Sequence, residues 1–308
     1  MKKAYFYIDD VIWIFRDLAR QKPKSIFDHH FLATLKKAHD MYGLKAQLNV
    51  FYRTDFYYGM DEFTLAEMPD IYKSEWEANS DWLRLAFHSL QEFPDYPFIN
   101  IDYDDMVKVF KLIEKEVIRF AGEKTFTYAI NTHWLPVSKD GCRALKDCGA
   151  ILLGASVGGR EEYNGDPSTL PYGHAQRLLN NRKPETGVFT RNSRDASIAK
   201  SICGYNHFTP EISDATLHNF SYYTDKDIDL KLKRFCSGPI LNLTPVDEIE
   251  EELSSYIGND FVGCATHEQY FFPEYFAYQS DSEEKVLRHA KYLTDNGYEF
   301  FFIEEILD

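Results

Sequence analysis

The chain has no run of about 18 consecutive apolar residues, the length that a membrane-spanning helix needs. Near its start it also lacks an apolar stretch followed by small residues, so we expect neither a membrane span nor a signal peptide. Positive charge is scarce: 34 Lys and Arg stand against 49 Asp and Glu, and the net charge is −15. Because such an acidic field repels polyanions, we do not expect nucleic acid as a partner.

Cysteine is limited to five residues, and no two of them have the spacing of a zinc ribbon or a CxxC motif. An odd number of cysteines without such spacing is typical of reduced thiols, which predicts a cytoplasmic protein. Glycine-rich phosphate loops are missing as well, since neither GxGxxG nor a P-loop follows the first apolar run. Asp9 and Asp10 occupy the place of such a loop, and carboxylates there would repel phosphate. Dinucleotide binding is therefore not expected.

The first apolar run, residues 4–10, ends on two adjacent carboxylates, Asp9 and Asp10. A buried strand cannot easily hide two like charges, so the pair is predicted at the C-terminal end of the strand. Sites in α/β folds are built at that edge. A bound cation would allow both groups to stay ionised. The alternative is a helix N-cap beside a solvated neighbour.

Apolar runs and apolar residues at helical spacing alternate along most of the chain. Strands are predicted at residues 4–10, 44–52, 83–87, 124–131, 150–153, 261–266 and 298–303, and the main helices at 25–42, 104–120, 138–148, 244–257 and 280–297. About seven strands in βα order predict an α/β fold, a distorted (β/α)7-type parallel barrel that forms one domain over residues 1–308. Residues 154–243 break this rhythm with glycines and prolines. We expect a loop-rich insertion with β-structure there, which elaborates the barrel.

Four predicted strands end on polar residues that suit a site. These are Asp9-Asp10, His88, Thr132-His133 and His267-Glu268. In a parallel barrel all of these ends surround one mouth, so the residues are expected to share one site.

A metal centre is the chemistry we expect at this mouth. His88 and Glu92 lie four residues apart and would share one face if the chain turns helically after His88. With Asp10 they would give three ligands and leave a position for water, as in catalytic zinc sites; nickel, cobalt and manganese are alternatives. Asp9 would then be the general base and His267 the general acid.

These residues resemble the motifs of the polysaccharide deacetylase (NodB-homology) group of the glycoside hydrolase/deacetylase superfamily. Ile8-Asp9-Asp10 is similar to its first motif, in which the first Asp is the base and the second binds metal. His88-Ser89-Leu90-Gln91-Glu92 is similar to its His-Ser/Thr-x-x-His motif, with Glu92 in place of the second His. The run YGLKA at residues 42–46 resembles the segment that leads into the second strand of the family. Of the family's third motif, the segment from Thr132 to Pro136 keeps only the proline.

The resemblance covers residues 1–153 and 244–308. It implies a divalent-metal hydrolase that removes N- or O-acetyl groups from a carbohydrate, with His267 as the acid. Trp13, His133, Trp134, Glu268 and Tyr270 are the residues we expect to contact the sugar.

Two other readings of the same residues stay open at this point. One is a glycoside hydrolase, in which two of the carboxylates form an acid/nucleophile pair. The other is a non-catalytic carbohydrate-binding protein that uses its aromatic side chains as stacking surfaces; those side chains could equally be core.

Overall fold

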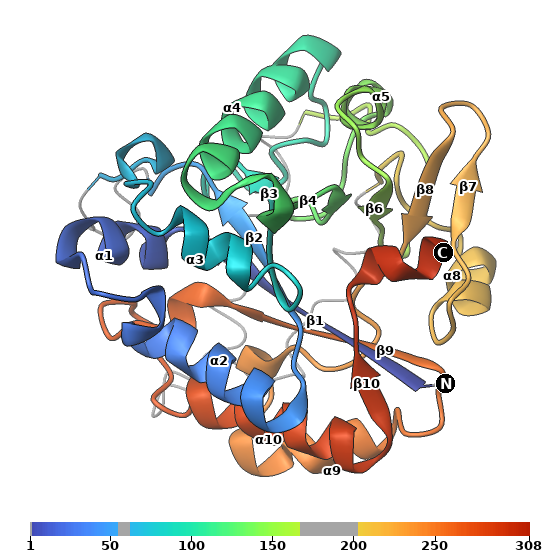
Figure 1. Cartoon of the computed structure of the whole chain (residues 1–308). Coiled ribbons are helices and arrows are strands. Elements are labelled where there is room, and N and C mark those ends of the chain that lie inside the picture. The colour runs from blue at the N-terminus through green and yellow to red at the C-terminus, as the bar shows by residue number, and fades with distance from the viewer. Residues whose placement is uncertain (1, 55–61, 167–202) are drawn as a thin grey trace.

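The frame of the molecule is a parallel sheet around its first strand. The computed structural model describes residues 2–54, 62–166 and 203–308. β1 (Lys2–Val11) crosses the centre, as Figure 1 shows, in a sheet of order β10-β1-β2-β3-β4, and β9 also pairs with β1. The other strands are β2 (Ala46–Phe51), β3 (Leu83–Ser89), β4 (Phe126–Thr127), β9 (Phe261–His267) and β10 (Tyr298–Phe300). Every pairing in this sheet is parallel.

A second sheet continues from β4, with Tyr128 as the only residue between β4 and β5. Its order is β5-β6-β8-β7, and β7 is antiparallel to β8. The bounds are β5 (Ala129–Ile130), β6 (Leu152–Gly154), β7 (Tyr223–Asp225) and β8 (Leu230–Lys233). The α/β class and the parallel strands are confirmed, whereas the closed seven-stranded barrel stays a prediction.

The segment after β8 returns to the first sheet. The backbone N–H groups of Ser237 and Gly238 donate to the carbonyl oxygen of Gly263 in β9, over 2.9 and 2.8 Å. A Cβ added at Gly263 would overlap the carbonyl oxygen of Phe235. Glycine is therefore required at this position, because it lets the two backbones approach so closely.

Helices lie around the outside of the two sheets, with α8 (Pro210–Thr216) beside β7 and β8 of the second one (Figure 1). The others are α1 (Trp13–Gln21), α2 (His30–Tyr42), α3 (Lys73–Ala78), α4 (Tyr103–Ala121), α5 (Lys139–Asp147), α9 (Ile249–Ser254) and α10 (Ser282–Asp295). α10 packs against α2 and α9, and α4 packs against α3 and α5. Ser138 caps α5 as predicted. The predicted helix over 25–42 is divided: Ser25 and Asp28 form a capping box around a 3₁₀ turn, and His29 caps α2.

Alternate residues of β1 belong to two different cores. Ala4, Phe6 and Ile8 pack in the core that the helices cover. Tyr5 and Tyr7 belong to a second, inner cluster. This period of two predicts that the odd-numbered positions of β1 face the interior, and Asp9 is the next of them.

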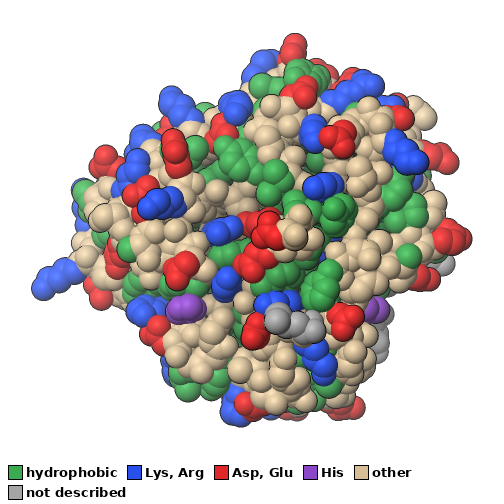
Figure 2. Space-filling view, turned by 45° about the vertical axis from the view of Figure 1, so that its right-hand side comes forward, with side chains coloured by type: hydrophobic (Ala, Val, Ile, Leu, Met, Phe, Trp, Pro, Cys, Tyr) green, Lys and Arg blue, Asp and Glu red, His purple; other side chains and the backbone are tan. Residues whose placement is uncertain are grey.

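The predicted insertion at 154–243 contains β8, which is a strand of the second sheet. Residues 167–202 of it lie outside the described residues. None of the helices in the described part of the chain is both long and apolar enough to cross a membrane. On the face that Figure 2 shows, acidic and basic side chains are interspersed.

His289, on α10, is a fully buried histidine in the outer core. Its ring packs against those of Phe6 and Phe300, with centroids 4.9 and 5.7 Å away. Neither ring nitrogen has a hydrogen-bond partner among the described residues. Burial lowers the pKa of His289 to about 3, so the ring stays neutral in the folded state.

We expect His289 to make the protein acid-sensitive. The unfolded chain takes up a proton near pH 6.5 and the folded chain near pH 3, so stability falls as the pH drops through this window. By this linkage the loss at pH 5 is on the order of 2 kcal/mol. Urea unfolding at pH 7.5 and pH 5 should show a smaller loss for His289→Phe than for the wild type. His30→Gln, at an exposed histidine, is the control, and equal losses in all three proteins would contradict the assignment.

Candidate metal centre

Asp9 and Asp10 both reach the same cavity, although neighbours along a strand normally face opposite sides. The pairing register of β1 with β2 shifts between Ile8 and Val11, and the φ angle of Asp10 is +65°. A bulge of this kind re-aims a side chain, and Asp tolerates the left-handed conformation better than most residues do. The side chain of Asp9 faces inward like that of Tyr7, and the bulge turns the side chain of Asp10 to the same side.

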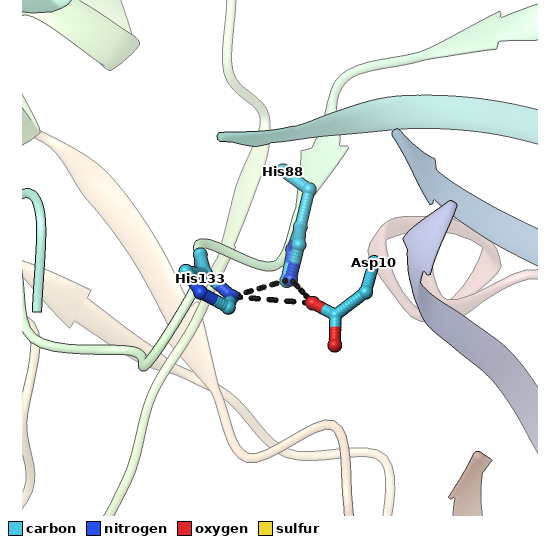
Figure 3. Close-up of side chains that lie close together, drawn as sticks. All are labelled: Asp10, His88 and His133. Carbon is cyan, nitrogen blue, oxygen red and sulfur yellow. Dashed lines mark hydrogen bonds and ion pairs between the residues drawn. The ribbon is translucent and has the colours of Figure 1, made fainter. Parts of the chain in front are cut away.

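Two histidines from neighbouring strand ends meet the carboxylate of Asp10, as Figure 3 shows. His88 lies in β3 and His133 follows β5. Oδ1 of Asp10 is 3.2 Å from Nε2 of His88 and 3.2 Å from Nδ1 of His133. The two nitrogens are 3.3 Å apart, and all three side chains are buried. Within the described residues, these three form the group that could hold a metal ion.

The remaining ring nitrogens of the histidines are bound to backbone carbonyls. Nδ1 of His88 donates to the carbonyl oxygen of Asn131 over 2.5 Å, and Nε2 of His133 donates to that of Glu92 over 2.9 Å. In a neutral ring these acceptors would leave the lone pair on the nitrogen that faces Asp10, where a metal could bind it, whereas a ring protonated on both nitrogens donates to Asp10 instead. Metal-ligating histidines are held in this way.

The spacing of the three ligand atoms fits a small divalent ion. Tetrahedral zinc with ligand bonds of ~2.0–2.1 Å separates its ligand atoms by about 3.3 Å. The separations here are 3.2, 3.2 and 3.3 Å. Two imidazoles and one carboxylate are also a donor set that zinc accepts while keeping a position open for water.

The two carboxylates differ electrostatically. Burial would raise the pKa of Asp10, but hydrogen bonds from His133 and His88 hold it well below its usual range. Burial raises the pKa of Asp9 above its usual value, against the attraction of His88. The pKa of His88 is raised in turn by Asp9 and Asp10, although burial alone would lower it. Asp10 is thus the better anionic ligand, and Asp9 the better proton acceptor.

Two asparagines hold Asp9. Nδ2 of Asn49 donates to its Oδ1 over 2.7 Å, and Nδ2 of Asn131 lies 3.3 and 3.2 Å from its two oxygens. A Cβ at Gly154 would overlap the side-chain oxygen of Asn131, so glycine is needed there to seat this amide. Neither asparagine was among the site residues predicted from the sequence. Gln47 and Asn49, polar at alternate positions of an otherwise apolar strand, were the signal that could have found Asn49.

Glu92 is not part of the ligand group. The sequence analysis placed it beside His88 on a helical turn, but β3 continues to Ser89 and the chain from 90 to 102 contains no helix. The spacing of four residues therefore does not bring the two side chains onto one face. His133, which we had expected to contact the sugar, takes the place of Glu92 in the candidate ligand set.

His267 ends β9 directly beside Asp9, with which it is paired in the β1–β9 register. It lines the same cavity as the candidate ligands. Its Nδ1 lies 2.9 Å from Oδ1 of the buried Asn242. The structure thus places the predicted acid at the site, next to the predicted base.

Glu268 has a structural position that the sequence did not indicate. Its carboxylate accepts from the backbone N–H groups of Ile12, Trp13 and Ile14 over 2.7–2.8 Å. These are N–H groups at the start of α1, which otherwise has no side-chain cap. Burial raises the pKa of Glu268 to about 8, although the three N–H groups favour the ionised form. We had expected Glu268 to contact sugar; its carboxylate is instead engaged by α1.

Trp13 is a second residue that we had expected to contact sugar, and it is buried in the core. It packs edge-on against Phe272 and Tyr275, with ring centroids 5.3 and 5.9 Å away. Only 1% of its surface is exposed, since it is the first residue of α1 and faces inward.

The cavity above the ligand group measures about 320 Å³. Its lining includes Trp134 and Tyr270, as expected, and also Tyr256, Tyr275 and Phe276. Trp134 and Leu135 follow His133 with φ angles of +60° and +73°. Two successive non-glycine residues in this region cost free energy, and such strain is concentrated at functional sites.

Comparison with known proteins gives a likeness of fold. No family model and no curated protein matches the chain. Among solved structures, it is similar to a 4-alpha-glucanotransferase from Thermococcus litoralis at 10% identity and a TM-score of 0.53. That match covers 100% of this chain, which spans 40% of the glucanotransferase chain.

A second similar structure is a family 4 acetyl xylan esterase from Clostridium thermocellum, solved in complex with a cobalt ion. The match has 12% identity and a TM-score of 0.44, over 99% of this chain and 90% of that chain. The first likeness concerns the fold alone, and the second is too distant to carry an argument.

Glu268→Ala should destabilise the fold, because it leaves three N–H groups of α1 without their buried acceptor. A buried donor left unpaired costs about 1–3 kcal/mol, so we expect a loss of at least about 3 kcal/mol in the free energy of unfolding. Urea unfolding measures it. Glu299→Ala, at an exposed glutamate, should change the value little. A loss at Glu268 no larger than that of this control would show that α1 does not need the cap.

Proposed function

We propose that this protein is a metal-dependent hydrolase that removes an acetyl group from a carbohydrate. The observation that carries the proposal is the convergence of Asp10, His88 and His133 at the spacing of metal ligands, with Asp9 beside them. Zinc suits the donor set, and nickel, cobalt and manganese are the alternatives.

The site residues can be given distinct tasks in this reaction. A divalent ion held by the three ligands would lower the pKa of a bound water towards ~7 and polarise the acetyl carbonyl. Asp9 accepts the proton of the water whose oxygen adds to the carbonyl carbon. His267 gives a proton to the leaving nitrogen or oxygen as its bond to that carbon breaks, which yields acetate and the free amine or hydroxyl. Asn49 and Asn131 keep Asp9 aimed during the proton transfer.

A carbohydrate substrate and a barrel architecture belong to the same proposal. The aromatic side chains of the cavity suit the apolar face of a sugar ring. The continuation of β4 into β5 through Tyr128, and the hydrogen bonds of the segment after β8 to β9, support a distorted seven-stranded barrel around the inner core. The fold is also similar to that of a glucanotransferase, an enzyme named for its action on a glucan.

The geometry supports the glycoside hydrolase alternative less well. An acid/nucleophile pair needs two carboxylates free to face the substrate. Glu268 is engaged by the start of α1, and Asp10 by two histidines and Gln269. Asp9 is then the carboxylate of the candidate centre that neither belongs to the candidate ligand group nor caps a helix.

Metal content tests the ligand set. Protein purified without chelator should contain about one equivalent of divalent metal by mass spectrometry, as three protein ligands and an open position imply. Asp10→Ala and His133→Ala should lose it, because each removes one ligand. Glu92→Gln is the matched control, since it changes the residue that the sequence analysis favoured, and it should keep the metal.

Two results would contradict this assignment. One is a wild-type protein that takes up no zinc, nickel, cobalt or manganese even after reconstitution. The other is a Glu92→Gln variant that loses metal while His133→Ala retains it.

Asp9→Asn separates the base from the ligands. The variant should keep its metal, because Asp9 is outside the ligand group. Its turnover of acetylated sugars should fall by about 10²–10⁴-fold, the usual contribution of a general base. Acetate release over a panel of N- and O-acetylated sugars, together with metal content, measures both. Wild-type turnover in Asp9→Asn would remove Asp9 from the reaction.

A further inference from the structure

Gln269 is a buried side chain at the candidate centre to which the mechanism above gives no task. It lies two residues after His267, is only 3% exposed, and lines the cavity together with Asp10. Its Nε2 donates to Oδ2 of Asp10 over 2.9 Å. Its Oε1 has no hydrogen-bond partner among the described residues.

The orientation of this amide is determined by Asp10. An ionised carboxylate can only accept hydrogen bonds, so the amide nitrogen has to face it. The amide oxygen is then left beside the carboxylate as an acceptor in a buried position. Leaving such an acceptor unpaired costs free energy, and a donor brought by a ligand would recover it.

We propose that Gln269 is a positioning and specificity residue, and this inference rests on the proposed function. Its amide nitrogen holds Asp10 so that Oδ1 faces the two histidines. Its amide oxygen accepts a hydrogen bond from the N–H group of an acetylamino substituent on the substrate. An O-acetyl ester has no hydrogen at that position, so Gln269 makes the site select N-acetyl over O-acetyl sugars.

The hydrogen bond between the substrate N–H group and Gln269 also orients the acetyl group for reaction. In an acetylamino group the N–H is attached to the carbonyl carbon that the water attacks. A hydrogen bond from that N–H to Gln269 therefore orients the carbonyl relative to the ligand group.

The positioning task is tested through zinc affinity, which needs no substrate. Zinc dissociation constants of the 308-residue chain are measured by competition with a chromophoric chelator. Gln269→Met, which has similar length and lacks both polar atoms, should bind zinc at least tenfold more weakly, as is usual for partners of metal ligands. Gln21→Met, at an exposed glutamine, makes the same chemical change as a control and should bind like the wild type.

The specificity task is tested by binding in the Asp9→Asn background, which prevents hydrolysis. The probes are methyl N-acetylglucosaminide and methyl 2-O-acetylglucoside, titrated by calorimetry into protein saturated with zinc. Gln269→Met should weaken binding of the N-acetyl probe about tenfold and that of the O-acetyl probe little. Gln269→Glu keeps an acceptor oxygen and loses the donor, so it should retain the preference for the N-acetyl probe while weakening zinc. Circular dichroism and urea midpoints verify that each variant is folded.

The outcomes separate this inference from the proposed function. A wild-type protein that takes up no zinc defeats the proposed function, and the inference falls with it. If the wild type loads zinc and Gln269→Met binds zinc equally well, the positioning task is overturned while the ligand set stands. Equal losses for both probes, or no preference in the wild type, overturn the specificity task alone.

Discussion

The candidate centre depends on one constraint: the carboxylate of Asp10 has to point inward, towards the cavity. Along a regular strand the side chain of Asp10 would point, like those of Phe6 and Ile8, into the apolar core under the helices. A bare carboxylate there would cost several kcal/mol. The left-handed backbone of Asp10 and the register shift beside it avoid this, and they place two successive carboxylates on one side of the sheet.

Three neighbouring side chains compensate for the burial of Asp10. His88, His133 and Gln269 reach it from three separate parts of the chain, and the two histidines are in turn held by backbone carbonyls. Parallel pairing makes this possible, since the ends of β1, β3 and β9 are brought to the same edge without any of them being close in sequence. The same arrangement explains why the two neighbouring aspartates behave differently: Asp10 faces two imidazoles, whereas burial outweighs the attraction of His88 and the two amides at Asp9.

Much of this could be read from the sequence, because it depends on local patterns. The apolar run before Asp9, the strand that ends near His88 and the cap at Ser138 are each encoded within a few residues. The choice between Glu92 and His133 as a ligand could not be read from the sequence, because a spacing of four residues places two side chains on one face only inside a helix. The contact of Glu268 with α1 spans more than 250 residues, and nothing near Glu268 announces it. Neutral amides carry no charge or motif: Asn49 was marked only by its polar position in an apolar strand, and no pattern marked Gln269.

Three consecutive residues at the end of β9 have three unrelated duties. His267 faces the cavity, Glu268 closes the first turn of α1, and Gln269 holds Asp10. Substitution in this tripeptide is therefore restricted in three ways at once, by the proposed proton donor, by the fold and by the candidate ligand group. Diversification of what the cavity accepts would have to proceed through other residues of its lining, such as Trp134, Tyr256 and Phe276, which have none of these three tasks. Engineers who wish to retarget the protein would begin with those aromatic residues and leave the tripeptide untouched.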